Sequence, residues 1–101
     1  MKVQIIGDNI KINRWVKNLV HDKVTIDLEK YLKDFSKDIK TATVKIKKRT
    51  RWGYKVNFNM WLPGKEHIFA DATHEDLPSA IVELREKVER QIKEYKGRLS
   101  S

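Results

Sequence analysis

The sequence predicts an α+β sandwich in which two helices pack on one face of a four-stranded sheet, in the order β-α-β-β-β-α. Apolar residues recur at three- and four-residue spacing over residues 15–35 and 77–99, which is typical of amphipathic helices. Apolar and polar residues alternate over residues 40–49, 54–62 and 66–72, which is typical of strands with one buried face. A further strand at the N-terminus completes the predicted order.

The N-terminal segment predicts a strand followed by a helix. Residues 2–6 are mostly β-branched and apolar, and Gly7-Asp8-Asn9 indicates a turn after them. Asn13 is a suitable N-cap, because its side chain can accept a hydrogen bond from the first helical turn. The helix is expected to run for about six turns. Its weak point is the β-branched run 24–26, where a kink can form. Its apolar stripe comprises Trp15, Leu19, Val20, Val24, Leu28, Tyr31, Leu32 and Phe35.

The three alternating segments predict a meander of antiparallel strands. Residues 48–53 supply a hairpin loop, and Pro63-Gly64 supplies the next turn. Each strand presents an apolar face to the helices and a mostly polar face to the other side. Trp61 and Phe69 depart from this pattern, since the alternation places both aromatic rings on the polar side.

The last helix is predicted to begin near Thr73 or Asp76, either of which can act as its N-cap. Pro78 then falls in the first turn, where proline is tolerated. Gly97 is expected to fray the C-terminal end, because glycine is a poor helix former. The apolar stripe comprises Leu77, Ala80, Ile81, Leu84, Val88, Ile92, Tyr95 and Leu99.

The length of 101 residues predicts one domain, residues 1–101, without a linker or an internal repeat. The absence of cysteine excludes disulfides, thiolate metal sites and cysteine nucleophiles. No segment reaches the roughly 20 apolar residues of a membrane span, and the N-terminus lacks the features of a signal peptide. We therefore expect a soluble protein located in the cytoplasm.

The net charge of +8 is concentrated in one segment of the chain. Residues 37–55 hold eight Lys or Arg residues and one acid, for a net charge of +7. A polyanion such as RNA or DNA is the expected partner, because a concentrated positive field attracts phosphates and releases their counterions. No basic amphipathic anchor accompanies the charge, so a membrane surface is not expected.

The hairpin between the second and third strands carries most of this charge. Arginine can bind phosphate through two hydrogen bonds, and tryptophan can stack on an unpaired base. The alternative is a solvated hairpin whose lysines protect the sheet from edge-to-edge aggregation. The residues concerned are Lys45, Lys47, Lys48, Arg49, Arg51 and Lys55, with Trp52 beside them.

No pattern in the sequence indicates catalysis. His21, His67 and His74 lie on different elements, and none has the spacing of a helical metal site. His74-Glu75-Asp76 groups a base with two carboxylates, but acidic residues are also favoured at a helix start. Glycine-rich phosphate loops and the nucleophile motif Gly-x-Ser-x-Gly are absent. We expect no catalytic residue, cofactor, metal site or small-molecule substrate.

The exposed aromatic residues Trp61 and Phe69 admit three interpretations. Aromatic rings on a four-stranded sheet stack bases in RNA-recognition motifs, although the strand order of those domains differs. A cross-strand aromatic pair that covers the open face is the simpler interpretation. The third is a weak homodimer that forms through this face.

On the last helix, acidic residues precede basic residues by four positions. This order favours ion pairs on a helix surface, worth about 0.2–0.5 kcal/mol each. From charge alone, the helix is predicted to present a self-paired face to solvent. The expected pairs are Glu83–Lys87, Glu86–Arg90, Glu89–Lys93 and Glu94–Arg98.

Several motifs extend over nearly the whole chain and are similar to those of one protein family. They are Val3-Gln4-Ile5-Ile6-Gly7 with Ile12-Asn13, Leu28-Glu29-Lys30-Tyr31, Leu62-Pro63-Gly64, His74-Glu75-Asp76-Leu77 with Ala80-Ile81, and Lys87-Val88-Glu89-Arg90-Gln91-Ile92-Lys93. On these residues the chain resembles the ribosome hibernation-promoting factors and ribosome-associated inhibitors, in a short form like the sigma-54 modulation proteins. The fold of that family has the same order of elements.

The resemblance implies a domain that binds the small ribosomal subunit between head and body. There it would contact ribosomal RNA and occupy space needed by messenger and transfer RNA, which would inhibit translation in stationary phase or stress. A generic RNA- or DNA-binding module that acts away from the ribosome is the alternative. The resemblance implies RNA contacts at Lys23, Lys30, Lys87, Arg90, Gln91, Lys93 and Lys96. The charge distribution adds Lys47, Lys48, Arg49 and Arg51.

The chain departs from the family pattern at three places. Residues 24–27 form a stretch that is one residue longer, Pro78 replaces a usual tyrosine, and Glu94 stands where a basic residue is common. Each departure is expected to weaken or to move an RNA contact. The chain also ends after the last helix, so we expect either a short form or a trimmed longer one.

Overall fold

A computed structural model describes residues 1–33, 35 and 41–100, with the side chains of residues 99 and 100 excepted. The predicted order of elements is confirmed, with the first helical region divided into three parts. The elements are β1 (Lys2–Asp8), α1 (Arg14–Val20), the π-helical segment η1 (His21–Thr25), α2 (Ile26–Leu32), β2 (Thr41–Lys48), β3 (Tyr54–Leu62), the 3₁₀ turn η3 (Pro63–Lys65), β4 (Glu66–His74) and α3 (Leu77–Ser100).

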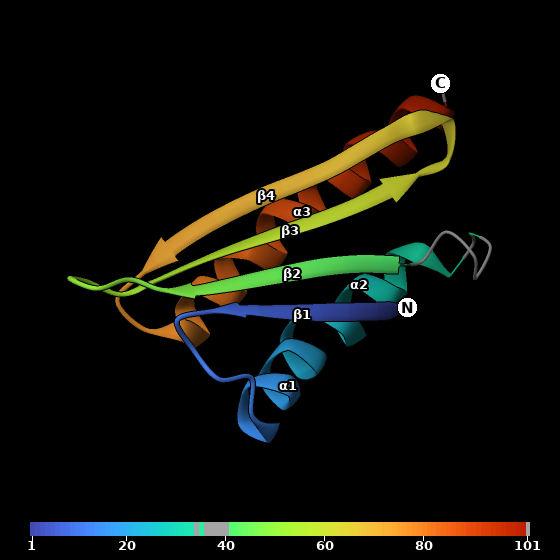
Figure 1. Ribbon diagram of the computed structural model, residues 1–101. Helices are drawn as coiled ribbons and strands as arrows, with labels where there is room; N and C mark the ends of the chain where they lie inside the picture. Colours follow the sequence, from blue (N-terminus) through green and yellow to red (C-terminus); the bar gives the residue numbers. More distant parts are fainter. Residues whose placement is uncertain (34, 36–40, 101) are drawn as a thin grey trace.

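The four strands form one mixed sheet in the order β1-β2-β3-β4. β1 pairs with β2 in parallel, whereas β2–β3 and β3–β4 are antiparallel hairpins. All three helices lie on one side of the sheet, and the loop between β2 and β3 projects at the end where β4 leads into α3 (Figure 1). This arrangement leaves the opposite side of the sheet open.

The core lies between the helices and the sheet. Inward side chains of β2, β3 and β4 are buried at every second residue, as the alternation predicts. α3 lies against β3 and β4 and supplies the other wall of the core with Leu84, Val88 and Ile92. Phe58 and Leu28 are among the largest fully buried side chains. The two-layer packing is therefore confirmed.

The first helical region is not one regular helix, and its buried stripe differs from the prediction. Asn13 caps α1 as expected, since its side chain accepts a hydrogen bond from the Val16 N–H at 3.0 Å. Trp15 was expected in the stripe but is 57% exposed. Phe35 was expected to belong to the helix, but it lies beyond the end of α2 at Leu32. The buried hydrophobic positions are Val16, Val20, Val24, Leu28 and Leu32, and Thr25 is buried beside them.

A π-helical turn explains this stripe. Residues four apart drift by about 40° around a regular helix of 3.6 residues per turn, so a spacing of four cannot stay on one face for long. The N–H of Ile26 bonds to the carbonyl of His21, five residues back. The wider turn takes up one additional residue, which reduces the drift. It begins just before the β-branched run 24–26.

α3 begins after the second of the two predicted caps and continues past Gly97. Asp76 is its N-cap: the Ser79 N–H donates to Asp76 Oδ1 at 2.8 Å, and the Ser79 hydroxyl lies 3.0 Å from Oδ2. These hydrogen bonds lower the pKa of Asp76 below its ordinary value. The expected fraying at Gly97 is wrong, because the helix continues to Ser100. The side chain of Leu99, a predicted member of the stripe, lies outside the described part of the chain.

Candidate nucleic-acid interface

The basic residues singled out in the sequence lie on two surfaces. The helix-layer surface is the set on η1, α2 and α3, namely Lys23, Lys30, Lys87, Arg90, Gln91, Lys93 and Lys96. The hairpin arm comprises the end of the β2–β3 hairpin and its loop, with Lys45, Lys47, Lys48, Arg49, Arg51, Trp52 and Lys55. Lys37 and Lys40, which belong to the same basic segment of the sequence, lie outside the described residues.

Two lysines of α3 form cation–π contacts, one with a ring on α2 and one with a ring just beyond its end. Lys93 Nζ lies 5.1 Å from the centre of the Tyr31 ring, and Lys96 Nζ lies 5.8 Å from the centre of the Phe35 ring. An exposed cation–π contact contributes about 0.5–1 kcal/mol. Lys93 remains exposed, so its ammonium stays available. The contact brings Lys93 to the helix that carries Lys30.

An ion-pair network also joins α2 to α3. Arg85 Nη1 donates a hydrogen bond to Asp27 Oδ2, and Lys30 Nζ lies 3.6 Å from Asp27 Oδ1. The bond from Arg85 is the main reason that the pKa of Asp27 lies below its ordinary value, while burial opposes the shift. Arg85 also lies 3.4 Å from Glu89. Sequence reasoning missed this pair, because Asp27 and Arg85 are 58 residues apart with no local pattern between them.

Lys23 lies beside acidic residues. With Pro78 and Val82 it lines a hollow of about 530 Å³ between η1 and the start of α3, and the same hollow is lined by Glu83 and Glu86. His74 Nε2 lies 3.3 Å from Glu83 Oε1. The carboxylates offset part of the field of Lys23.

Lys87 and Gln91 contact the outer edge of β4. Lys87 Nζ donates to the carbonyl of Asp71 at 2.8 Å and lies 3.7 Å from Glu83. The Gln91 amide donates to the carbonyl of Phe69 at 2.5 Å and accepts from its N–H at 3.2 Å. Both side chains therefore form hydrogen bonds with the backbone of the edge strand, a role that the sequence does not indicate.

The predicted ion pairs along α3 form only in part. Glu83–Lys87 is present, whereas Glu89 pairs with Arg85 and Arg98 Nη2 bonds to Glu66 on β4 at 2.5 Å. Arg90 is exposed, and no ion pair or hydrogen bond holds it within the part of the chain that the structure describes. Among the predicted RNA contacts on α3, Arg90 is thus an available guanidinium.

The hairpin arm is a tight loop on two long strands. The Arg49 N–H bonds to the carbonyl of Gly53 at 3.0 Å, and Gly53 has φ +68°. Lys47 stands directly opposite Lys55 in the register of the two strands. Arg49 and Arg51 in the loop are exposed, and Trp52 is 51% exposed. The arm therefore presents its cations to solvent, as its sequence predicts.

The open face of the sheet carries the exposed aromatic residues. Of the three interpretations of Trp61 and Phe69, the direct cross-strand pair is wrong. Trp61 stacks on His67 instead, with ring centres 4.5 Å apart and 18° between the planes. His67 stands opposite Trp61 in the register, whereas Phe69 stands opposite Asn59. The Phe69 ring lies 6.2 Å from the His67 ring and completes a row of three. A histidine was thus missed as the central ring.

The described residues include neither a metal-binding cluster nor a membrane-spanning helix. No group of three or more His, Cys, Asp or Glu side chains among them could hold a metal ion. None of the described helices is both long and apolar enough to cross a membrane.

Comparison with known proteins identifies the family. A family model described as sigma 54 modulation protein / S30EA ribosomal protein matches residues 3–100. The ribosome hibernation promotion factor of Lactococcus lactis subsp. cremoris (strain MG1363) is 35% identical over 101 residues, which cover 99% of this chain and 52% of that protein. The factor of the same name from Staphylococcus aureus (strain COL) is 28% identical over 100 residues, 99% of this chain and 50% of that protein.

A solved structure supports the fold. The crystal structure of the Thermus thermophilus Protein Y N-terminal domain superposes with a TM-score of 0.77 at 23% identity, covering 94% of this chain and 99% of that one. The chain spans about half the length of the two curated relatives. The match over residues 3–100 shows that the chain belongs to the family of sigma 54 modulation proteins and S30EA ribosomal proteins.

Proposed function

We propose that this domain binds the small ribosomal subunit through contacts to ribosomal RNA and blocks the binding of messenger and transfer RNA. Translation is thereby inhibited in stationary phase or stress, by occupation of space and without catalysis. The proposal places the protein in the cytoplasm. The family match over residues 3–100, with relatives named ribosome hibernation promotion factor, carries the proposal.

The charge of the helix-layer surface supports this role. Arg90 and Lys93 are exposed on α3, and Lys30 is exposed on the neighbouring α2. The ion pairs nearby do not prevent RNA binding, because an exposed pair is worth only about 0–1 kcal/mol and a lysine can exchange a carboxylate for a phosphate. Positive side chains on two adjacent helices can follow a phosphate backbone.

Co-sedimentation with small ribosomal subunits across a salt series tests the proposal. Binding should fall steeply as salt rises, because each neutralised phosphate adds about 0.7–0.9 to the slope of log affinity against log salt. The absence of co-sedimentation at low salt would refute it. A companion series with purified large subunits checks that binding is specific to the small subunit.

The alternative function is a generic RNA- or DNA-binding module that acts away from the ribosome. The hairpin arm favours it, since Lys47, Lys48, Arg49 and Arg51 are a concentrated charge that needs no ribosome to attract a nucleic acid. Competition decides between the two functions. If free duplex or single-stranded RNA displaces the protein from small subunits at equimolar phosphate, the generic module is the better description.

A further inference from the structure

The open face of the sheet, opposite the helix layer, has two different ends. Along β3 its outward residues are Lys55, Asn57, Asn59 and Trp61, in that order. Lysines gather at the end near the hairpin arm, and aromatic rings gather at the other end. On β3 the side chains between them are polar and uncharged, whereas on β4 the carboxylate residue Asp71 stands opposite Asn57. Trp61 follows Lys55 by six positions along the strand, a span of about 20 Å.

The basic end holds three lysines and one neighbouring carboxylate, since Asp8 stands beside Lys47 in the register of β1 and β2. Lys45, Lys47 and Lys55 line a hollow of about 210 Å³ together with Asp8 and Asn57. None of the three lysines forms an ion pair within the described residues. Like charges directly opposite each other on paired strands are destabilising, and Lys47 faces Lys55. An anion bound here would relieve that repulsion.

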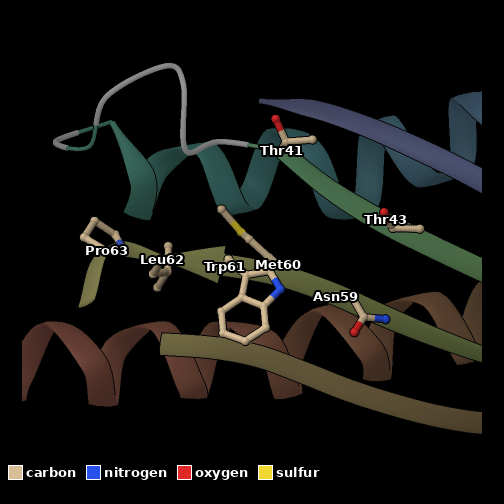
Figure 2. Close-up of a pocket in the computed structure, with 7 residues that line it drawn as sticks. All are labelled: Thr41, Thr43, Asn59, Met60, Trp61, Leu62 and Pro63. Atoms are coloured by element: carbon tan, nitrogen blue, oxygen red, sulfur yellow. The ribbon is translucent and has the colours of Figure 1, made fainter. Parts of the chain in front are cut away.

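The aromatic end is a preformed platform. His67 is held between Trp61 and Asn59, since its ring stacks on the indole and its Nε2 lies 2.9 Å from Asn59 Oδ1. Trp61 is 57% exposed and Phe69 is 44% exposed. Trp61 borders a hollow of about 490 Å³ that is also lined by Thr41 and Asn59. Figure 2 shows the indole extending from β3, with these polar side chains around it.

We propose that this face is a second nucleic-acid site that binds a short single strand of RNA. Phosphates lie at Lys45, Lys47 and Lys55, and bases stack at Trp61 and Phe69. A single strand is required, because a base inside a duplex has no free face to offer a protein ring. The span fits the lower end of the roughly 4–16 nucleotides that comparable sheet-based sites cover.

Charge complementarity distinguishes this occupant from a second copy of the chain. A homodimer through the same face would bury Lys45, Lys47 and Lys55, and the other copy would offer only the carboxylates of Asp8 and Asp71 there. Buried charges that lack a partner are strongly unfavourable. RNA supplies both an apolar base for the rings and a phosphate for the lysines. The site lies across the sheet from the helix-layer surface, so the domain can contact two RNA segments at once. The proposed single-strand site can therefore be refuted without refuting ribosome binding, and ribosome binding can be refuted without refuting the single-strand site.

The test is fluorescence anisotropy with a labelled oligouridine of about 12 nucleotides. Trp61→Ala should weaken binding roughly tenfold or more, as expected for the loss of one stacked base, and Trp61→Tyr should restore most of it. Trp15→Ala is the matched control, because Trp15 is also 57% exposed but lies on α1. Lys55→Ala should lower the salt slope by about 0.7, whereas Lys11→Ala in the β1–α1 loop should leave it unchanged.

A second readout reports directly on the platform. In the Trp15→Phe, Trp52→Phe protein, Trp61 is the single tryptophan, and oligouridine should quench its emission. Wild-type affinity in Trp61→Ala, equal losses in Trp15→Ala, or preference for duplex over single-stranded RNA would each overturn the proposal. So would a concentration-dependent dimer that Trp61→Ala abolishes in sedimentation equilibrium, since it would assign the face to self-association.

Discussion

Gln91 on α3 binds both backbone polar groups of Phe69 on β4, at 2.5 Å to the carbonyl and 3.2 Å to the N–H. β4 is an edge strand, and its outer N–H and C=O groups would otherwise offer a template for another strand. Lys87 bonds to Asp71 one turn earlier. The distance from Lys87 to Gln91 along α3 matches the distance from Asp71 to Phe69 along β4, because four helical residues advance about 6 Å and two strand residues about 6.8 Å. α3 thus closes this edge with side chains.

Gln91→Ala should lower the free energy of unfolding by about 1 kcal/mol, the usual net value of intramolecular hydrogen bonds of this kind. It should also raise the tendency to aggregate, because the edge of β4 becomes available. Urea denaturation and light scattering measure the two effects. Gln4→Ala is the control, since Gln4 is an exposed glutamine on β1. Equal stability of the two variants would contradict the structural role of Gln91.

The Asp27–Arg85 pair should make stability depend on pH in the acid range. Its hydrogen bond lowers the folded pKa of Asp27 below the ordinary 3.8. A lowered carboxyl pKa stabilises the fold above the unfolded value, and this contribution is lost as pH falls through the folded value. Asp27→Asn should therefore unfold at a lower temperature than wild type near neutral pH. The difference should shrink below a pH of about 3.8.

Thermal unfolding followed by circular dichroism across that pH range gives the measurement. Asp22→Asn serves as the control, because Asp22 is exposed and forms no ion pair within the described residues. Its difference from wild type should be small at every pH. If the difference in unfolding temperature between Asp27→Asn and wild type stays constant down to strong acid, the Asp27–Arg85 pair is not the source of the pH dependence.

Arg90 and Lys87 should separate RNA binding from folding. Arg90→Glu should reduce co-sedimentation with small subunits and leave the thermal midpoint close to that of wild type, because Arg90 is exposed and unpaired within the described chain. Lys87→Glu should reduce both quantities, since it removes the bond to Asp71 and sets a second carboxylate near Glu83. Sedimentation and thermal unfolding should be measured on the same preparations. Unfolding caused by Arg90→Glu would show that its role is structural.

Gly53 and Gly64 have similar φ angles, but substitution by alanine should destabilise the protein to different extents at the two positions. Gly53 has φ +68° and Gly64 has φ +78°. A Cβ at Gly53 would lie 2.2 Å from the carbonyl oxygen of His74, whereas a Cβ at Gly64 would have no described atom within 4 Å apart from those of Gly64 and its two chain neighbours. Gly64→Ala should cost about 1–2 kcal/mol for the left-handed conformation alone.

Gly53→Ala should destabilise more than Gly64→Ala, because the hairpin arm must also move away from the end of β4. Chemical denaturation of both variants measures the difference. Gly53→Ala should also change the salt dependence of RNA binding, since it displaces Arg49 and Arg51. Equal stabilities would indicate that the arm moves freely relative to His74.

The fold was predictable from local patterns to a large extent. Alternation over β2, β3 and β4 assigned the buried face of each strand. Asn13 was correct as a helix cap, and the structure selects Asp76 from the two predicted alternatives, Thr73 and Asp76. These features depend on neighbours within a few residues, so the chain carries their signal locally. The basic hairpin arm was predictable for the same reason.

The prediction that Trp15 lies in the buried stripe was wrong because the first helical region is not regular. A regular helix was assumed through residues 15–35, and the π-helical turn at His21–Thr25 shifts which residues face the core. Val16 is buried and Trp15 is exposed as a result. β-branching marked the weak point, but the choice between a kink and a wide turn depends on packing against the sheet and α3.

Local sequence patterns were sufficient to predict the order of the elements, the faces of the strands and the concentration of charge in the hairpin arm. The packing of the folded chain was needed to establish the parallel pairing of β1 with β2, the bond of Arg85 to Asp27 and the bonds of Gln91 to Phe69. The last two join residues that are 58 and 22 positions apart. Periodicity reports only which side of an element is apolar. Which residues of two elements meet depends on how the layers pack.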